Sequence, residues 1–164
     1  MIRARLTWAR RVAPVAATLC ANFATAQVTV ADAWVRGTVE GQTSTAAYLK
    51  LHSDTDARLI SVTSPVAARC TVHEMTMNGN VMRMRTLDSL PIPAGRAVAL
   101  EEGHDHLMLE GLVHPLKPGE VVTLTLTFTE SSTAKQRTVE VRAPVRPLGA
   151  SGADDQHTTM PMKR

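Results

Sequence analysis

Apolar and polar residues alternate in short runs along most of the chain from residue 28 onward. The clearest run is Val121–Phe128, in which threonines separate Val122, Leu124, Leu126 and Phe128. A period of two places alternate side chains on one face of a β-strand. We therefore expect this run to be a strand whose four alternating apolar side chains face the core.

Eight further runs of this kind are separated by turn residues, and no window has the pattern of a long amphipathic helix. The sequence therefore predicts one all-β domain, an antiparallel β-sandwich or Greek-key barrel of about nine strands. The other expected strands are Val28–Val35 (with Trp34 in the core), Ala46–His52, Leu59–Val62, Cys70–Met77, Val81–Thr86, Ala97–Leu100, His106–Glu110 and Gln136–Val141.

Two adjacent runs, Cys70–Met77 and Val81–Thr86, predict a hairpin with histidine and methionine on one face. If Asn78-Gly79 forms a two-residue turn, His73 lies directly opposite Met84. A four-residue loop would leave His73 diagonal to Met84 but on the same face, whereas a one-residue slip would separate them. The same face also carries Met75, Met77 and Met82.

The run His106–Glu110 adds His106 and Met108, which again share a face. Two imidazoles and two thioethers can therefore converge from three strands. Thioether sulfur is soft and neutral, so it suits Cu(I) and adds little for Zn²⁺, Mg²⁺ or Ca²⁺. Any one of these methionines alone would be interpreted as a gap-filling core residue. Together they favour a Cu(I) site made of His73, Met84, His106 and Met108.

These four residues form an H-x10-M-x21-H-x-M pattern that resembles the PCu(A)C-like periplasmic copper chaperones. The segments Val81–Arg85, Ile92–Gly95 and His106–Leu112 are also similar to that family, and the likeness extends over nearly the whole mature chain. The resemblance implies a cupredoxin-like fold. Two departures are Asn80, where the family usually has a hairpin glycine, and His104, which replaces a common glycine and adds a third imidazole.

Residues 1–26 resemble a secretory signal, with four arginines, a short apolar stretch and an Ala24-Thr25-Ala26 cleavage site. The apolar stretch is too short for a permanent membrane anchor. Leu19 before Cys20 argues against lipidation. We therefore expect a periplasmic protein with a copper-binding domain at 27–145 and a flexible tail at 146–164 that contains His157.

Removing the signal leaves 14 basic and 15 acidic residues, so the mature net charge is −1 and the overall excess of +3 belongs to the signal. The mature chain has no basic stripe with interleaved aromatic residues, and we expect no nucleic-acid partner. Cys70 is its single cysteine, which excludes an internal disulfide. Cys70 lies an odd number of positions from His73, so we expect it on the opposite face, as a small buried residue.

The leading hypothesis is a monomeric copper chaperone that passes Cu(I) to a cytochrome c oxidase subunit or to a thiol-containing assembly factor. The alternative is copper buffering or tolerance. We expect no enzyme activity, because a zinc hydrolase would not need thioether ligands. A blue-copper electron-transfer site would require a Cys thiolate beside two histidines. A weaker accessory Cu(II) site at His104 and His157 is a further hypothesis.

Overall fold

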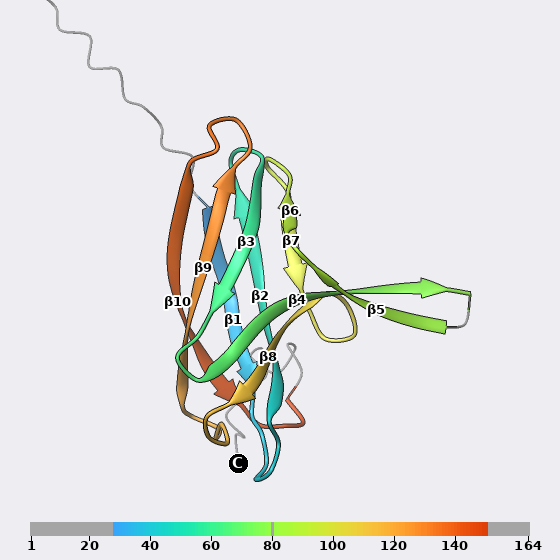
Figure 1. The fold of residues 1–164 in the computed structure, drawn as a ribbon, viewed down its shortest axis with the longest axis vertical. Helices are drawn as coiled ribbons and strands as arrows, with labels where there is room; N and C mark the ends of the chain where they lie inside the picture. The colour runs from blue at the N-terminus through green and yellow to red at the C-terminus, as the bar shows by residue number, and fades with distance from the viewer. Residues whose placement is uncertain (1–27, 80, 151–164) are drawn as a thin grey trace, which may run out of the picture.

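The computed structural model describes residues 28–79 and 81–150, whose regular secondary structure is entirely β-strand (Figure 1). The all-β prediction is confirmed, and all nine expected strands are present. The tenth, Leu90–Ile92, was missed because three residues around a proline are too short to show an alternation. The strands are β1 (Val28–Arg36), β2 (Ser44–Ser53), β3 (Ala57–Thr63), β4 (Ala67–Asn78), β5 (Val81–Leu87), β6 (Leu90–Ile92), β7 (Ala97–Leu100), β8 (His106–Leu112), β9 (Val121–Glu130) and β10 (Gln136–Arg146).

The strands hydrogen-bond in the order β5-β4-β8-β2-β1-β10-β9-β3-β6, and β7 pairs separately with β2. Among the described pairs only β1 and β10 are parallel, and they join the two halves of the sheet. β3 and β4 lie near opposite ends of this strand order but contact each other, which shows that the sheet folds back on itself. Its two halves therefore enclose a single apolar core.

The core contains the side chains that the alternation placed there. Val122, Leu124, Leu126 and Phe128 on β9 are all fully buried. Trp34 is only 4% exposed and packs on Tyr48, with the ring centroids 4.4 Å apart. This rigid frame positions the strands that carry the histidines and methionines.

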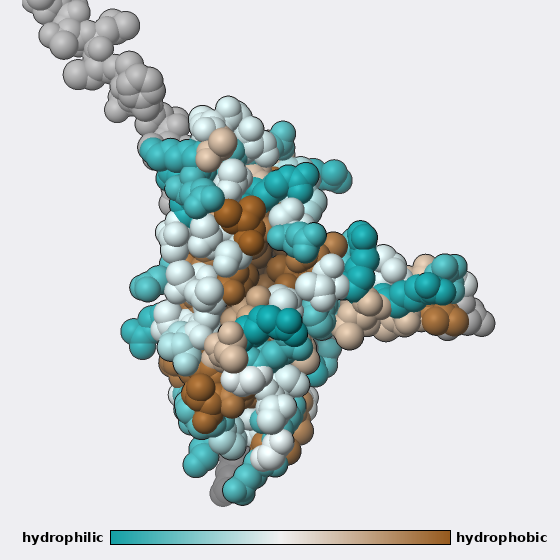
Figure 2. Space-filling model, viewed as in Figure 1, coloured by the Kyte–Doolittle hydropathy of each residue, from teal (hydrophilic) through white to brown (hydrophobic). Residues whose placement is uncertain are grey.

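The β4–β5 hairpin projects from the body as a two-stranded arm (Figure 1). Pairing of β4 with β8 ends at His73, whereas pairing with β5 continues to Asn78. His73 thus lies at the root of the arm. In the space-filling view, apolar and hydrophilic surfaces both extend along the arm towards its tip (Figure 2).

The expected signal segment 1–26 and His157 lie outside the described residues. β10 reaches Arg146, one residue beyond the expected end of the domain. Within residues 28–79 and 81–150, no helix has the length and apolar character needed to cross a membrane.

Candidate metal centre

The two central histidines face each other at the root of the arm. His73 on β4 and His106, the first residue of β8, are direct partners in the strand ladder. Their ring centroids are 5.6 Å apart, with an edge-to-face angle of 68°. Both side chains are half-buried. The structure therefore brings two predicted site residues from separate strands into immediate proximity.

The two predicted methionines flank this histidine pair. Met108 follows His106 by two positions on β8 and pairs with Thr71, which places it diagonally from His73. On the other side of β4, Met84 of β5 is also diagonal to His73. Side chains of paired and alternate residues project from the same face of a sheet. All four predicted donors consequently share one face of β5, β4 and β8.

The pairing within the arm differs from the first of the two predicted registers. Asn78 pairs with Val81, so His73 lies opposite Thr86 and not Met84; the prediction of a direct His73–Met84 pair is wrong. The diagonal arrangement expected for a longer loop is the one observed. Asn78 belongs to the strand, and Gly79 follows it with a φ of 62°. Glycine adopts this positive φ readily, so the turn falls one place later than the Asn-Gly pattern indicated.

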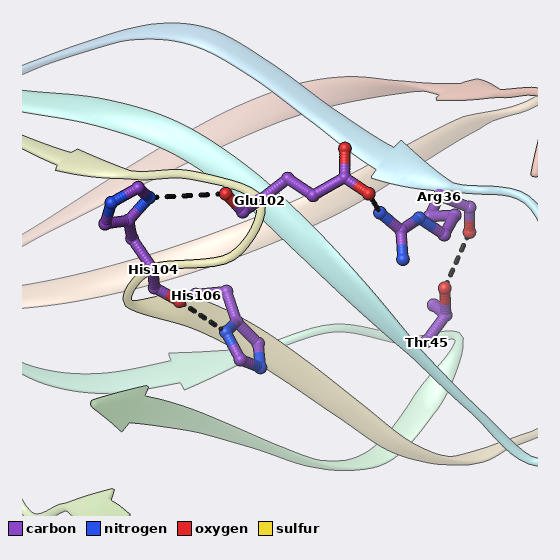
Figure 3. A network of polar contacts seen from close by, with 5 residues as sticks. All are labelled: Arg36, Thr45, Glu102, His104 and His106. Carbon is purple, nitrogen blue, oxygen red and sulfur yellow. Dashed lines mark hydrogen bonds and ion pairs between the residues drawn. The ribbon is translucent and has the colours of Figure 1, made fainter. Parts of the chain in front are cut away.

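Hydrogen bonds orient the imidazole of His106. Its Nδ1 lies 2.8 Å from the backbone carbonyl oxygen of His104. Figure 3 marks this contact with a dashed line. A carbonyl can only accept, so Nδ1 carries the proton and Nε2 keeps a free lone pair. A backbone partner of this kind fixes the tautomer of metal-binding histidines. Nε2 of His106 is therefore available to bind a metal.

His73 also offers a free nitrogen. Its Nε2 is 3.1 Å from the hydroxyl oxygen of Thr71, whereas its Nδ1 is buried without a hydrogen-bond partner. A buried polar atom without a partner calls for a specific explanation, and a metal ion would supply one. Burial lowers the pKa of His73, and the neighbouring His106 lowers it further. The ring is thus kept in the neutral form that metal binding requires.

The remaining nearby chemistry does not supply a hard-metal or thiolate site. In the part of the chain that the structure describes, no three His, Cys, Asp or Glu side chains gather where they could hold a metal ion. Cys70 pairs with Leu109 of the core and lies on the face opposite to His73, as its odd spacing predicted. Burial raises the pKa of its thiol to about 11. Among the described residues, the further soft donors on the face of the histidine pair are therefore thioethers.

The loop before β8 is anchored on both sides by residues that the sequence did not single out. Asp105 accepts a hydrogen bond through Oδ1 from the backbone N–H of Met75, at 2.9 Å. Glu102 forms an ion pair with Arg36 of β1 (Figure 3). Asp105 is adjacent to the predicted ligand His106, and this position was the available signal in the sequence. Its partner Met75 is 30 positions away, so the contact itself could not be recognised. The Asp105 contact holds the start of β8, and hence His106, against β4, and the Glu102 contact ties the same loop to β1.

His104, the third imidazole of the sequence analysis, precedes β8 and does not belong to a strand. It lies in the exposed loop, and its Nδ1 is 3.3 Å from the carbonyl oxygen of Glu102. Its observed contribution is the carbonyl group that orients His106. The second residue of the hypothetical accessory site, His157, is outside the described residues.

Comparison with known proteins gives matches over nearly the whole β-domain. Residues 28–145 match the family described as "Putative lipoprotein LpqE-like". The chain is 32% identical over 131 residues to "Putative lipoprotein Lxx21020" from Leifsonia xyli subsp. xyli, covering 79% of this chain and 75% of the relative.

Solved structures with the same fold include copper-bound proteins. The solution structure of CuI-DR1885 from Deinococcus radiodurans is 32% identical, with a TM-score of 0.59, and the match covers 76% of this chain and 80% of that one. The copper-bound PCuAC domain from PmoF2 has a TM-score of 0.59, covers 73% of this chain and 92% of that one, and at 22% identity shows the shared fold. The resemblance predicted from the sequence and the cupredoxin-like fold are thus confirmed.

Proposed function

The chain belongs to the LpqE-like family. We propose that it is an extracytoplasmic copper carrier. It would hold one Cu(I) between His73, His106, Met84 and Met108. The observation that carries this proposal is the facing His73–His106 pair, whose ring centroids are 5.6 Å apart. Met84 and Met108 lie diagonal to His73 on the two neighbouring strands.

The donor atoms explain the choice of ion. Imidazole and thioether are both neutral, and a monovalent soft cation needs no buried carboxylate or thiolate to balance its charge. Nε2 of His106 and the unpartnered Nδ1 of His73 are the nitrogen atoms free to donate. CuI-DR1885 was solved in its Cu(I) form, and the same cargo accounts for the donors present here.

The position of the site suits transfer to another protein. Met84 is 58% exposed on the projecting arm, whereas both histidines are half-buried at its root. An incoming ligand could therefore replace the Met84 thioether first and the imidazoles afterwards. A thiolate is a softer and stronger donor for Cu(I) than a thioether, so transfer to a thiol-containing recipient is favourable.

The recipient in this proposal is a copper site of cytochrome c oxidase or an assembly factor that serves it. The expected signal segment would place the protein in the periplasm, where it would act as a monomer. The alternative role is copper buffering or tolerance, which the same donor set would also serve.

Cu(I) titration against a competing chelator tests the site. The purified protein should bind one Cu(I) tightly and little Zn²⁺. His106→Ala and Met108→Leu should each weaken binding by more than about 100-fold, because loss of a ligand should exceed the 10- to 100-fold typical of outer-shell partners. Met75→Leu is the matched control, since it removes a thioether from the same face without removing a proposed ligand. Equal losses for Met75→Leu and Met108→Leu would contradict the assignment.

Deletion of the gene separates delivery from buffering. A delivery role predicts reduced oxidase activity in copper-poor medium, restored by added copper. Unchanged oxidase activity together with increased sensitivity to copper would instead favour the buffering role.

A further inference from the structure

The arm carries two pairs of methionines that extend outward from the candidate metal centre. Met75 lies directly opposite Met84, and we call these the inner pair. Met77 lies directly opposite Met82 nearer the tip, and we call these the outer pair. Both pairs share the face that carries His73, because all belong to alternate positions of the same ladder. Four thioethers thus form two successive rows on one surface.

These methionines are not part of the hydrophobic core. Met77, Met82 and Met84 are 64%, 54% and 58% exposed, whereas methionine used as a packing residue is normally buried. The other face of the arm has a different composition, with Glu74 opposite and ion-paired to Arg85. Folding alone therefore does not account for the thioether face.

The spacing of the rows suits a soft cation. Directly opposite residues have Cβ atoms about 4.5–5.5 Å apart, and the unbranched methionine side chain can bring two sulfur atoms to one ion. Successive rows are two residues apart, about 7 Å along an antiparallel strand. The outer pair, the inner pair and His73 are therefore separated by equal short steps. Met84 belongs both to the inner pair and to the proposed primary site.

We propose that Met77 and Met82 form a second, weaker site for a soft monovalent cation, through which Cu(I) enters and leaves the primary site. At each step a thioether lone pair donates to Cu⁺ before the previous sulfur dissociates, and the oxidation state of copper does not change. Two neutral sulfurs bind more weakly than the full set of two imidazoles and two thioethers. The entry role rests on the proposed function, whereas binding at the outer pair does not.

Methyl NMR of the whole protein, labelled with ¹³C at the methionine methyl groups, tests the second site. Ag(I) is the probe because it is soft, monovalent and redox-stable. The first equivalent should shift the Met84 and Met108 methyl signals, and further Ag(I) should shift those of Met77 and Met82. Unchanged Met77 and Met82 signals after several equivalents would overturn the inference. If Met77 and Met82 shift but Met84 and Met108 do not, the second site stands and the proposed primary site fails.

Transfer kinetics test the role of the second site. Cu(I)-loaded protein is mixed with excess bathocuproine disulfonate, which forms a coloured Cu(I) complex. The double variant Met77→Leu/Met82→Leu should keep the equilibrium affinity of the primary site but release copper about three- to tenfold more slowly, equivalent to about 0.7–1.4 kcal/mol in the barrier. Met160→Leu/Met162→Leu removes the same number of thioethers elsewhere and should release copper at the wild-type rate. Equal release rates in wild type and the Met77/Met82 variant would overturn the entry role.

Discussion

Asp105 offers a direct test of how the loop before β8 supports the metal centre. Its carboxylate accepts a hydrogen bond from the backbone N–H of Met75, one strand away, and its own carbonyl accepts a hydrogen bond from the N–H of Glu101. The next residue is His106. Replacing Asp105 with alanine would remove only the side-chain link, so the loop would lose its connection to β4 at that point.

The expected magnitude follows from the type of bond. Hydrogen bonds to charged groups contribute about 1.5–3 kcal/mol, and Asp105 is only half-buried, so we expect about 1–2 kcal/mol. Asp105→Ala should lower the free energy of unfolding by that amount. The freed loop must then be ordered when metal binds, which should weaken Cu(I) by about three- to tenfold. Asp105→Asn keeps a side-chain oxygen that can accept the hydrogen bond, and should lose less on both measures.

Urea denaturation and Cu(I) competition titrations measure the two quantities on the same variants. Equal destabilisation by Asp105→Asn and Asp105→Ala would refute the hydrogen bond as the source. A loss of affinity beyond about 100-fold with unchanged stability would mean that Asp105 binds the ion itself, since positioning effects are smaller.

Three further outcomes are expected. In urea denaturation, Gly111→Ala should destabilise the fold more than Gly103→Ala. Both glycines have a positive φ, which costs an L-residue about 1–2 kcal/mol, but of the two only residue 111 would bring the added carbon against a β4 side chain, at 2.8 Å. Equal losses of stability would contradict this argument. Iodoacetamide should modify Cys70 slowly at pH 8, because burial raises the pKa of the thiol to about 11 and little thiolate exists until the pH approaches that value. In urea-unfolded protein the same thiol should react at the rate of a free thiol. In the copper-free protein, peroxide should oxidise exposed Met84 faster than half-buried Met108. Bound Cu(I) should protect both residues from oxidation. Mass spectrometry that shows no protection would count against ligation by sulfur.

The sequence alone determined nine of the ten strands, the faces of their side chains and the chemistry of the proposed donors. Alternation with a period of two is a local property. It places the alternate apolar residues from Val122 to Phe128 in the core, and Cys70 on the strand face opposite to that of His73, whatever the neighbouring strands are. The set of two histidines and two methionines follows from residue identity, and its preference for a soft cation follows from the properties of imidazole and thioether. These inferences need no knowledge of strand order.

The tertiary structure decided which of these residues meet. Whether His73 faces Met84 or Thr86 depends on a two-residue shift in pairing, which leaves every side chain on its original face and so cannot be recognised from the alternation. The contact of His73 with His106 depends on β8 being the neighbour of β4, and Asp105 reaches Met75 only because that neighbour is in place. Such contacts join residues some thirty positions apart, and the packing of the whole domain selects them. Local patterns therefore specified the proposed donors, whereas the folded sheet specified their arrangement and left Met77, Met82 and Met84 exposed on the arm.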